Sequence, residues 1–187
     1  MNLEPVTHKN LFLIGYRCTG KSSVGKLLAG KLGRPFIDTD SLLVSESGSS
    51  IKEIVAARGW EGFRKIEHDI LKQVCLIDRQ VVATGGGVVL SDTNVNLMKK
   101  SGKLVWLKAT PETIEKRMMR DQATEAFRPA LTSKDNLAEI EETLVERESL
   151  YSQAMDFYVE TDGRQIADIC DMIIRHFRRI GFEQYRC

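Results

Sequence analysis

Short apolar runs alternate along the chain with longer stretches in which apolar residues recur at helical spacing. The apolar runs predict buried strands at residues 11–15, 36–38, 80–84, 104–107 and 157–160. The periodic stretches predict helices at residues 21–32, 50–58, 60–78, from 111 onward, 136–155 and 165–177. Strands that alternate with helices build a parallel sheet with helices on both faces, so the pattern predicts an α/β fold with three layers.

Glycine, proline and polar segments mark the boundaries of these elements. Gly33 closes the first helix, Pro35 prevents its continuation, and Pro111 occupies the first turn of a later helix. Residues 121–135 are polar and lack periodicity, which predicts a mobile loop, and residues 178–187 predict a loosely held tail. Because neither a linker nor an internal repeat interrupts the 187 residues, we expect a single domain over residues 1–187.

The overall composition narrows the class of protein. Apolar residues make up 42% and charged residues 28%, as in ordinary globular enzymes, and a formal net charge of +1 argues against a nucleic-acid partner. The apolar runs are too short to cross a membrane, and the polar first ten residues do not resemble a signal peptide. The four cysteines are far apart and the three histidines are scattered, which indicates reduced thiols in the cytoplasm and no metal cluster. Without a heptad seam, we expect a monomer.

The strongest chemical signal is the segment GYRCTGKS at residues 15–22, which fits the Walker A pattern G-x-x-x-x-G-K-[ST]. Gly15 and Gly20 let the backbone wrap a phosphate with its N–H groups pointing inward, and the following helix adds the positive end of its dipole. Lys21 can then reach the β- and γ-phosphates, and the Ser22 hydroxyl can ligate Mg²⁺. The segment therefore predicts a phosphate-binding loop (P-loop), although GTPases and ATPases share this motif with kinases.

Two carboxylates follow the predicted strand at residues 36–38. Asp38 and Asp40 belong to the sequence DTD, at the edge where parallel sheets bind ligands. One carboxylate could hold the hydration shell of Mg²⁺ while the other hydrogen-bonds an acceptor hydroxyl. Taken alone, they could instead be caps of a helix over residues 41–47, which is the less favoured interpretation.

Four further signals are weak when each is taken alone. Arg64 and Glu67 share one helix face and could form an anion receptor, or simply a surface salt bridge. The glycine run at residues 85–87 could let a ligand touch backbone N–H groups, or could be a flexible loop. Arg128 could stabilise the transferred phosphoryl group from a lid, or be an ordinary loop arginine. Arg147 lies between two glutamates, as expected on a solvated charged face.

In order, the P-loop, DTD, FRKIE, TGGG, FRPAL and ERESLY resemble the shikimate kinase family from residue 11 to about residue 177. The resemblance implies a P-loop kinase fold like that of nucleoside monophosphate kinases, with a five-stranded parallel sheet and a lid that closes over ATP. It also implies transfer of the γ-phosphoryl group of ATP to the 3-hydroxyl of shikimate, on the pathway to chorismate and the aromatic amino acids.

The same resemblance implies the roles of individual residues. ATP would be bound by Gly15, Cys18, Thr19, Gly20, Lys21, Ser22, Ser23, Arg117, Arg128 and Arg164. Shikimate would be bound by Asp40, Arg64, Gly86, Gly87 and Arg147. The first two belong to the substrate-binding helices expected at about residues 38–78, and the other three follow later in the chain. Mg²⁺ would be held by Ser22 and Asp38, Glu67 would steady Arg64, and residues 121–135 would form the lid. The catalytic residues would be Lys21, Asp40 and Arg128.

The chain departs from the family pattern in three places. Cys18 stands where family members usually carry glycine, the approach to the lid at residues 120–127 is longer, and the region near Ile166 lacks a proline. Two alternatives share the fold. A gluconate or nucleotide kinase would not need this set of motifs, and a non-catalytic regulator would have lost Lys21, Asp40 or Arg128.

Overall fold

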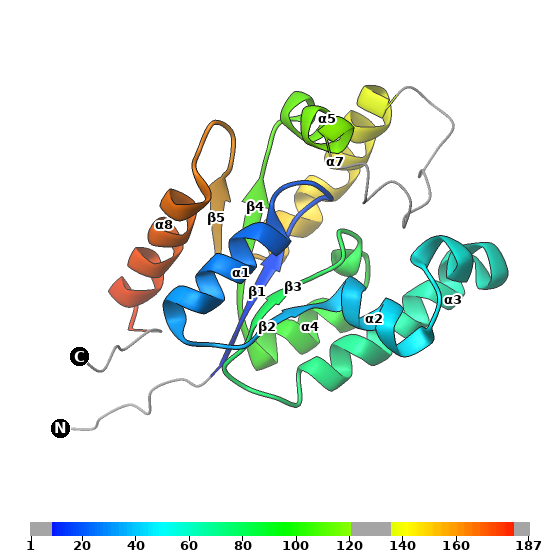
Figure 1. Cartoon of the computed structure of the whole chain (residues 1–187), viewed down its shortest axis with the longest axis horizontal. Coiled ribbons are helices and arrows are strands. Elements are labelled where there is room, and N and C mark those ends of the chain that lie inside the picture. The colour runs from blue at the N-terminus through cyan, green and yellow to red at the C-terminus, as the bar shows by residue number, and fades with distance from the viewer. Residues whose placement is uncertain (1–8, 121–135, 182–187) are drawn as a thin grey trace.

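Five parallel strands form the central sheet of the computed structural model, which describes residues 9–120 and 136–181 (Figure 1). The strands are β1 (Asn10–Ile14), β2 (Phe36–Asp38), β3 (Val81–Ala83), β4 (Gly102–Lys108) and β5 (Phe157–Glu160). Their order across the sheet is β2-β3-β1-β4-β5, with every pairing parallel. The predicted five-stranded parallel sheet is confirmed.

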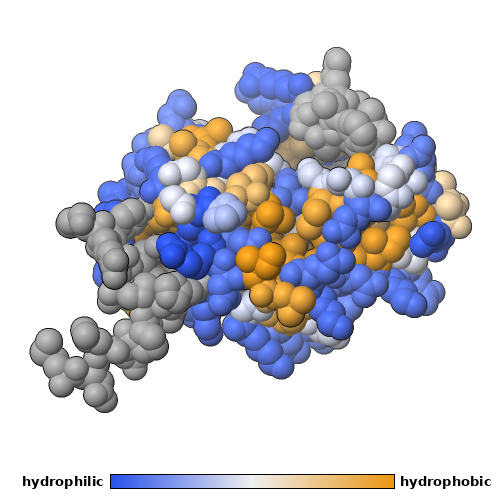
Figure 2. All heavy atoms as spheres, turned by 60° about the horizontal axis from the view of Figure 1, so that its bottom comes forward, coloured by the Kyte–Doolittle hydropathy of each residue, from blue (hydrophilic) through white to orange (hydrophobic). Residues whose placement is uncertain are grey.

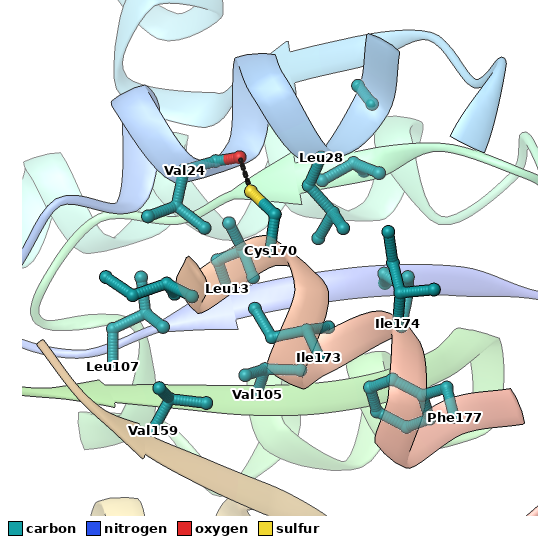
Figure 3. Close-up of a cluster of buried hydrophobic side chains, with 14 residues drawn as sticks. Leu13, Val24, Leu28, Val105, Leu107, Val159, Cys170, Ile173, Ile174 and Phe177 are labelled. Atoms are coloured by element: carbon teal, nitrogen blue, oxygen red, sulfur yellow. Dashed lines mark hydrogen bonds between the residues drawn. The ribbon is translucent and has the colours of Figure 1, made fainter. Parts of the chain in front are cut away.

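Helices cover both faces of this sheet. They are α1 (Lys21–Leu32), α2 (Thr39–Ser47), α3 (Ile51–Val74), α4 (Asp92–Ser101), α5 (Pro111–Arg120), α7 (Asn136–Ala154) and α8 (Ile166–Arg179), with a short 3₁₀ helix η1 (Val88–Leu90). One buried cluster joins the sheet to α1 and α8, and Figure 3 shows Val24 of α1 facing Cys170 and Ile173 of α8. A second cluster joins the opposite face to α3, α4 and α7. The sheet and the helices packed on each of its two faces therefore form three layers.

The central strand β1 explains why the sheet could be recognised from its sequence. All five of its residues are fully or almost fully buried, because helices cover the sheet on both sides. On the molecular face in Figure 2, hydrophilic side chains surround interrupted groups of hydrophobic ones. Among the described residues, no helix is both long enough and apolar enough to span a membrane.

Several element boundaries differ from those predicted. The two helices expected at 50–58 and 60–78 are one element, α3, which is interrupted at Gly59 (φ 68°, ψ 178°) and ends at Val74. Helix α8 continues to Arg179, two residues into the segment expected to be a tail. Helix α4 was not predicted, because its sequence DTNVNLMKKS carries few apolar residues, although the Ser91 N-cap marks its start. The loop predicted at residues 121–135 lies outside the described residues.

The ends of β1, β2 and β3 bring the chemical motifs together. The P-loop follows β1, DTD spans the junction of β2 and α2, and the glycine run follows β3. Since these three strands are parallel neighbours, all three motifs lie at the same edge of the sheet (Figure 1).

Candidate active site

The P-loop curves tightly around the side chain of Lys21. Gly15 and Gly20 have positive φ angles of 137° and 98°, and a Cβ on Gly15 would lie 2.5 Å from the Leu107 carbonyl oxygen. Lys21 Nζ donates to the carbonyl oxygens of Gly15 and Tyr16 at 2.8 and 2.7 Å, and the residue is 8% exposed. The lysine is therefore held within the loop, where a phosphate would replace the carbonyl oxygens as its partner.

A cleft of about 480 Å³ opens along the P-loop and α1. Its lining includes most of the predicted ATP-binding set, namely Cys18, Thr19, Gly20, Lys21, Ser22, Ser23, Arg117 and Arg164. Gly15 shapes the loop without lining the cleft, and Arg128 lies outside the described residues. Sequence reasoning missed Arg120, Thr84, Thr161, Ile166 and Ile169, which come from four different parts of the chain.

Arg117 connects the two walls of this cleft. Its guanidinium donates to the Cys18 carbonyl oxygen at 3.3 Å and to the side-chain and main-chain oxygens of Thr161 at 3.0 and 2.9 Å. The predicted stacking partner of adenine is thus fixed between the P-loop and the turn after β5. Arg164, the other predicted flanking residue, is exposed on that turn.

Asp38 combines two contacts in one carboxylate. Its Oδ1 accepts from the N–H groups of Asp40 and Ser41 at 3.1 and 3.2 Å, which makes Asp38 the N-cap of α2. Its Oδ2 accepts a hydrogen bond from Ser22 Oγ at 2.6 Å. The capping interpretation is therefore correct for Asp38, and the second oxygen still faces the P-loop.

These oxygens fit a magnesium ion that is bound together with a nucleotide. Mg²⁺ prefers oxygen ligands and is usually held by one or two protein groups, with phosphates and water completing its shell. Ser22 and Asp38 supply a hydroxyl and a carboxylate side by side. Over residues 9–120 and 136–181, no group of three or more His, Cys, Asp or Glu side chains forms a metal site made of protein alone.

A second, smaller cavity of about 70 Å³ lies between α3, the P-loop, the glycine run and α7. It is lined by Tyr16, Arg17, Asp40, Ile51, Trp60, Phe63, Arg64, Glu67, Gly85, Gly86, Gly87 and Arg147. Every residue in the predicted shikimate-binding set belongs to this lining. Asp40, which is 8% exposed, lines both the cavity and the larger cleft, so its carboxylate stands where the two meet.

Arg64 and Glu67 form a partly buried ion pair in the lining of this cavity. Arg64 Nη1 lies 2.7 Å from Glu67 Oε2, and Glu67 is only 3% exposed, which excludes an ordinary surface salt bridge. Burial raises the pKa of Glu67, against the opposing effect of the Arg64 charge. The guanidinium carbon lies 5.7 and 5.2 Å from the ring centres of Trp60 and Phe63, so its position is fixed from two sides.

Gly87 is needed because the Arg64 guanidinium approaches its backbone closely. A Cβ at this position would collide with the central carbon and both terminal nitrogens of the guanidinium. Close approach, rather than flexibility, therefore explains the glycine run at this point.

Arg147 lines the cavity, so the solvated charged face that its neighbouring glutamates suggest when it is taken alone does not apply. The side chain is half-buried, and Nη1 lies 3.5 Å from the Gly86 carbonyl oxygen. Among the described residues, no carboxylate pairs with Arg147, whereas Arg64 has Glu67 and Arg17 has Glu139. The cavity therefore contains a guanidinium group whose positive charge no described carboxylate balances, so an anionic ligand could bind there.

The unsatisfied polar atoms of the described chain gather around the same cavity. Buried side-chain nitrogen and oxygen atoms normally have hydrogen-bond partners. The described exceptions are Tyr16 OH, Arg17 Nε, Glu67 Oε1 and Arg147 Nε, and each belongs to a lining residue. This concentration of unused donors and acceptors is typical of a site built for a polar ligand.

Sequence reasoning missed part of the cavity wall. The helix predicted at residues 60–78 gives Trp60 and Phe63 no role beyond its apolar face, yet both line the cavity and Trp60 remains 39% exposed. Arg17 occupies a variable position of the P-loop and pairs with Glu139 at 2.9 Å, with side-chain exposures of 14% and 2%. In the sequence, Gly59 signals the helix break before Trp60 and Phe63. Nothing near Arg17 in the chain indicates that it pairs with Glu139 of α7.

Three described cysteines are in no disulfide and have different surroundings, so we expect different rates of alkylation. Burial raises the pKa of Cys170 to about 11 and also raises the pKa of Cys75, so both should react slowly. Cys18 is partly exposed at the nucleotide cleft, although it also packs against the cluster around Ile114. A maleimide should therefore modify Cys18 before the other two, as measured by peptide mass spectrometry.

MgADP should protect Cys18, because phosphates in the P-loop would cover it. Inactivation should follow modification of Cys18, and Cys18→Gly should remain active and resist the reagent. Equal inactivation of Cys18→Gly and the parent would show that another thiol is responsible.

Comparisons with known proteins point to one family. The family model for shikimate kinase matches residues 17–178. Curated shikimate kinases from Thermodesulfovibrio yellowstonii and Symbiobacterium thermophilum are 40% and 38% identical, over 92% of this chain and 97% and 98% of the relatives.

Solved structures agree with this result. A shikimate kinase from Acinetobacter baumannii in complex with shikimate has a TM-score of 0.88 at 29% identity, over 95% of this chain and 97% of that one. The Aquifex aeolicus shikimate kinase has a TM-score of 0.76 at 29% identity, over 94% and 99% of the two chains. A gluconokinase from Sinorhizobium meliloti, with a TM-score of 0.55 at 17% identity over 92% and 93%, shares the fold alone.

Proposed function

The chain belongs to the shikimate kinase family, and from this premise we propose how its residues carry out the reaction. The protein is an ATP-dependent kinase that phosphorylates the 3-hydroxyl of shikimate, giving shikimate 3-phosphate and ADP on the pathway to the aromatic amino acids. The resemblance drawn from its motifs is thereby confirmed.

The observation that carries the assignment of the acceptor site is the guanidinium of Arg147. It lacks a carboxylate partner among the described residues, and the cavity that it lines meets the nucleotide cleft at Asp40. An acceptor with a carboxylate and ring hydroxyls would satisfy this arrangement: Arg147 and Arg64 bind the carboxylate, and Glu67 holds Arg64 in place. Gly86 and Gly87 contact the hydroxyls through the backbone.

In the nucleotide cleft, the P-loop backbone and Lys21 bind the phosphates of ATP. Ser22 and Asp38 would hold Mg²⁺, which would neutralise charge on the phosphates. Asp40 binds the acceptor hydroxyl and either orients it or takes its proton. Both roles place the Asp40 carboxylate beside the acceptor hydroxyl. Phosphoryl transfer itself depends largely on positioning and charge stabilisation.

Other parts of the assignment rest on the sequence. Arg128 and the lid expected at residues 121–135 lie outside the described residues, so their roles stay predictions. We propose a monomer in the cytoplasm that acts on a small molecule, with neither a nucleic-acid nor a membrane partner. The near-neutral net charge of +1 and the lack of disulfides among the described cysteines support this view.

The test is ADP production from MgATP with different acceptors. Shikimate should be phosphorylated, whereas gluconate and a panel of nucleoside monophosphates should give only the background rate measured without acceptor. Turnover of gluconate or of a nucleoside monophosphate at a rate equal to that with shikimate would contradict the assigned acceptor site.

A further inference from the structure

Tyr151 lies one helical turn after Arg147 on α7 and is fully buried. Its ring stacks on Trp106 of β4, with ring centres 5.4 Å apart and an angle of 20° between the ring planes. Both residues belong to the core cluster on the side of the sheet that α3, α4 and α7 cover. The position of the Tyr151 ring is therefore set by the sheet itself.

The hydroxyl of Tyr151 leaves this apolar contact and donates to the carbonyl oxygen of Gly86, 65 residues away in the chain. Among the described residues, the other donor to this carbonyl is Arg147 Nη1, whose distance of 3.5 Å is long for a hydrogen bond. Tyr151 is thus the principal contact that fixes the Gly86 carbonyl, and it does so beside the guanidinium proposed to bind the acceptor.

Other contacts secure the glycine run only at its ends. The Gly85 N–H donates to Thr39 Oγ1 at 3.2 Å, and the carbonyl oxygens of Gly85 and Gly87 accept from Val88 and Leu90 in η1. Within the described part of the chain, the N–H groups of Gly86 and Gly87 have no hydrogen-bond acceptor. Both glycines line the cavity, which places this stretch of backbone beside a ligand bound there.

The geometry of the peptide bond connects these observations. The Gly86 carbonyl and the Gly87 N–H belong to one planar peptide unit, and the described backbone has no cis peptide bonds. In a trans peptide unit the carbonyl and the N–H point in opposite directions, so a hydrogen bond that fixes one also fixes the other. By holding the Gly86 carbonyl, Tyr151 sets the direction in which the Gly87 N–H points.

The tyrosine is suited to this task because it stays a donor. Burial raises the pKa of its hydroxyl well above the ordinary value, against the opposing effect of the Arg147 charge. The hydroxyl consequently remains protonated under working conditions, and the carbonyl of Gly86 is an acceptor at every pH.

We propose that Tyr151 is a positioning residue for acceptor binding, and that its hydroxyl aims the Gly87 N–H and the Arg147 guanidinium at the bound acceptor. This proposal rests on the assignment of the acceptor cavity given above. Tyr151 does not touch the acceptor in this scheme but acts through the peptide unit and the side chain that do.

Tyr151→Phe tests the proposal, because it removes the hydroxyl and keeps the stacked ring. Leaving a buried carbonyl without its donor should raise the KM for shikimate about tenfold. The KM for ATP should stay within about twofold, since the nucleotide cleft is lined by other residues. Tyr158→Phe is the matched control, because Tyr158 is 48% exposed on β5 and lies away from the cavity lining.

A purely structural role would have a different signature. It would lower the melting temperature and change the KM of both substrates or the amount of active enzyme, without selectivity for the acceptor. If Tyr151 acts through Arg147, the KM effects of Tyr151→Phe and Arg147→Lys should be less than multiplicative in the double variant. An unchanged KM for shikimate in Tyr151→Phe, or equal increases for both substrates, would overturn the proposal.

A measurement on the unmodified protein covers the case in which Tyr151→Phe does not fold. With ¹⁵N-glycine labelling, shikimate added without nucleotide should shift the Gly87 amide signal, while the signal of exposed Gly30 on α1 stays in place. Absence of a Gly87 shift at saturating shikimate would refute the role of the peptide unit. If the unmodified enzyme does not phosphorylate shikimate at all, the acceptor assignment itself fails, which is a separate outcome.

Discussion

Lys21→Ala should lower kcat by at least about 100-fold while the protein remains folded, as expected when one preorganised donor to a developing charge is lost. In the structure, Lys21 Nζ is held by two carbonyl oxygens of the P-loop, at 2.8 and 2.7 Å. A phosphate that binds in the loop replaces these carbonyl oxygens as the partner of the lysine. The lysine then stabilises the negative phosphate oxygens during phosphoryl transfer. Alanine keeps the helix but removes the cation.

The measurement is kcat with saturating MgATP and shikimate, accompanied by circular dichroism to confirm the fold. Lys26→Ala is a suitable control, because Lys26 is an exposed lysine on the same helix. A folded Lys21→Ala protein that keeps more than about a tenth of kcat, a loss below about 1.4 kcal/mol, would show that the assigned phosphate role is wrong.

Arg64→Lys and Arg147→Lys should each raise the KM for shikimate by about 10- to 150-fold, the effect of losing one charge-assisted hydrogen bond. Lysine keeps the positive charge but lacks the planar fork that matches a carboxylate. At position 64 the fork also serves Glu67, which is 3% exposed and depends on its partner. At position 147 the charge has no described carboxylate partner, so the whole loss should appear in acceptor binding.

These two variants are informative because neither Arg64 nor Arg147 lines the nucleotide cleft. The KM for ATP should hardly change, and Arg175→Lys, an exposed substitution on α8, should leave both constants as they are. An increase for ATP as large as the increase for shikimate would place these arginines on the nucleotide instead.

Local chemistry explains which parts of the site could be predicted from the sequence. The P-loop is recognisable because its glycines, its lysine and its serine act within eight consecutive residues of the chain. Strand β1 is recognisable because it is buried on both faces and is therefore apolar throughout. The bounds of α1 were predicted correctly, since Gly33 marks its end with a φ angle of 59°.

The remaining features depend on contacts between distant segments. The local sequence around Arg147 suggests a charged surface, and only the family resemblance predicts its place at the cavity, where α7 packs beside the glycine run. Helix α4 escaped prediction because its buried side chains include Asn94, which pairs with His68 of α3 at 2.6 Å. In both cases the deciding partner is more than 20 residues away in the chain.

The close approach of Arg64 to Gly87 restricts how this enzyme could escape an inhibitor. A side chain at position 87 would expel the guanidinium that binds the acceptor, and a change at position 64 would leave Glu67 buried without its partner. A change at either position alone should therefore weaken binding of the acceptor. A compound that hydrogen-bonds both the Gly87 backbone and Arg64 would therefore leave few single mutations that confer resistance and preserve activity.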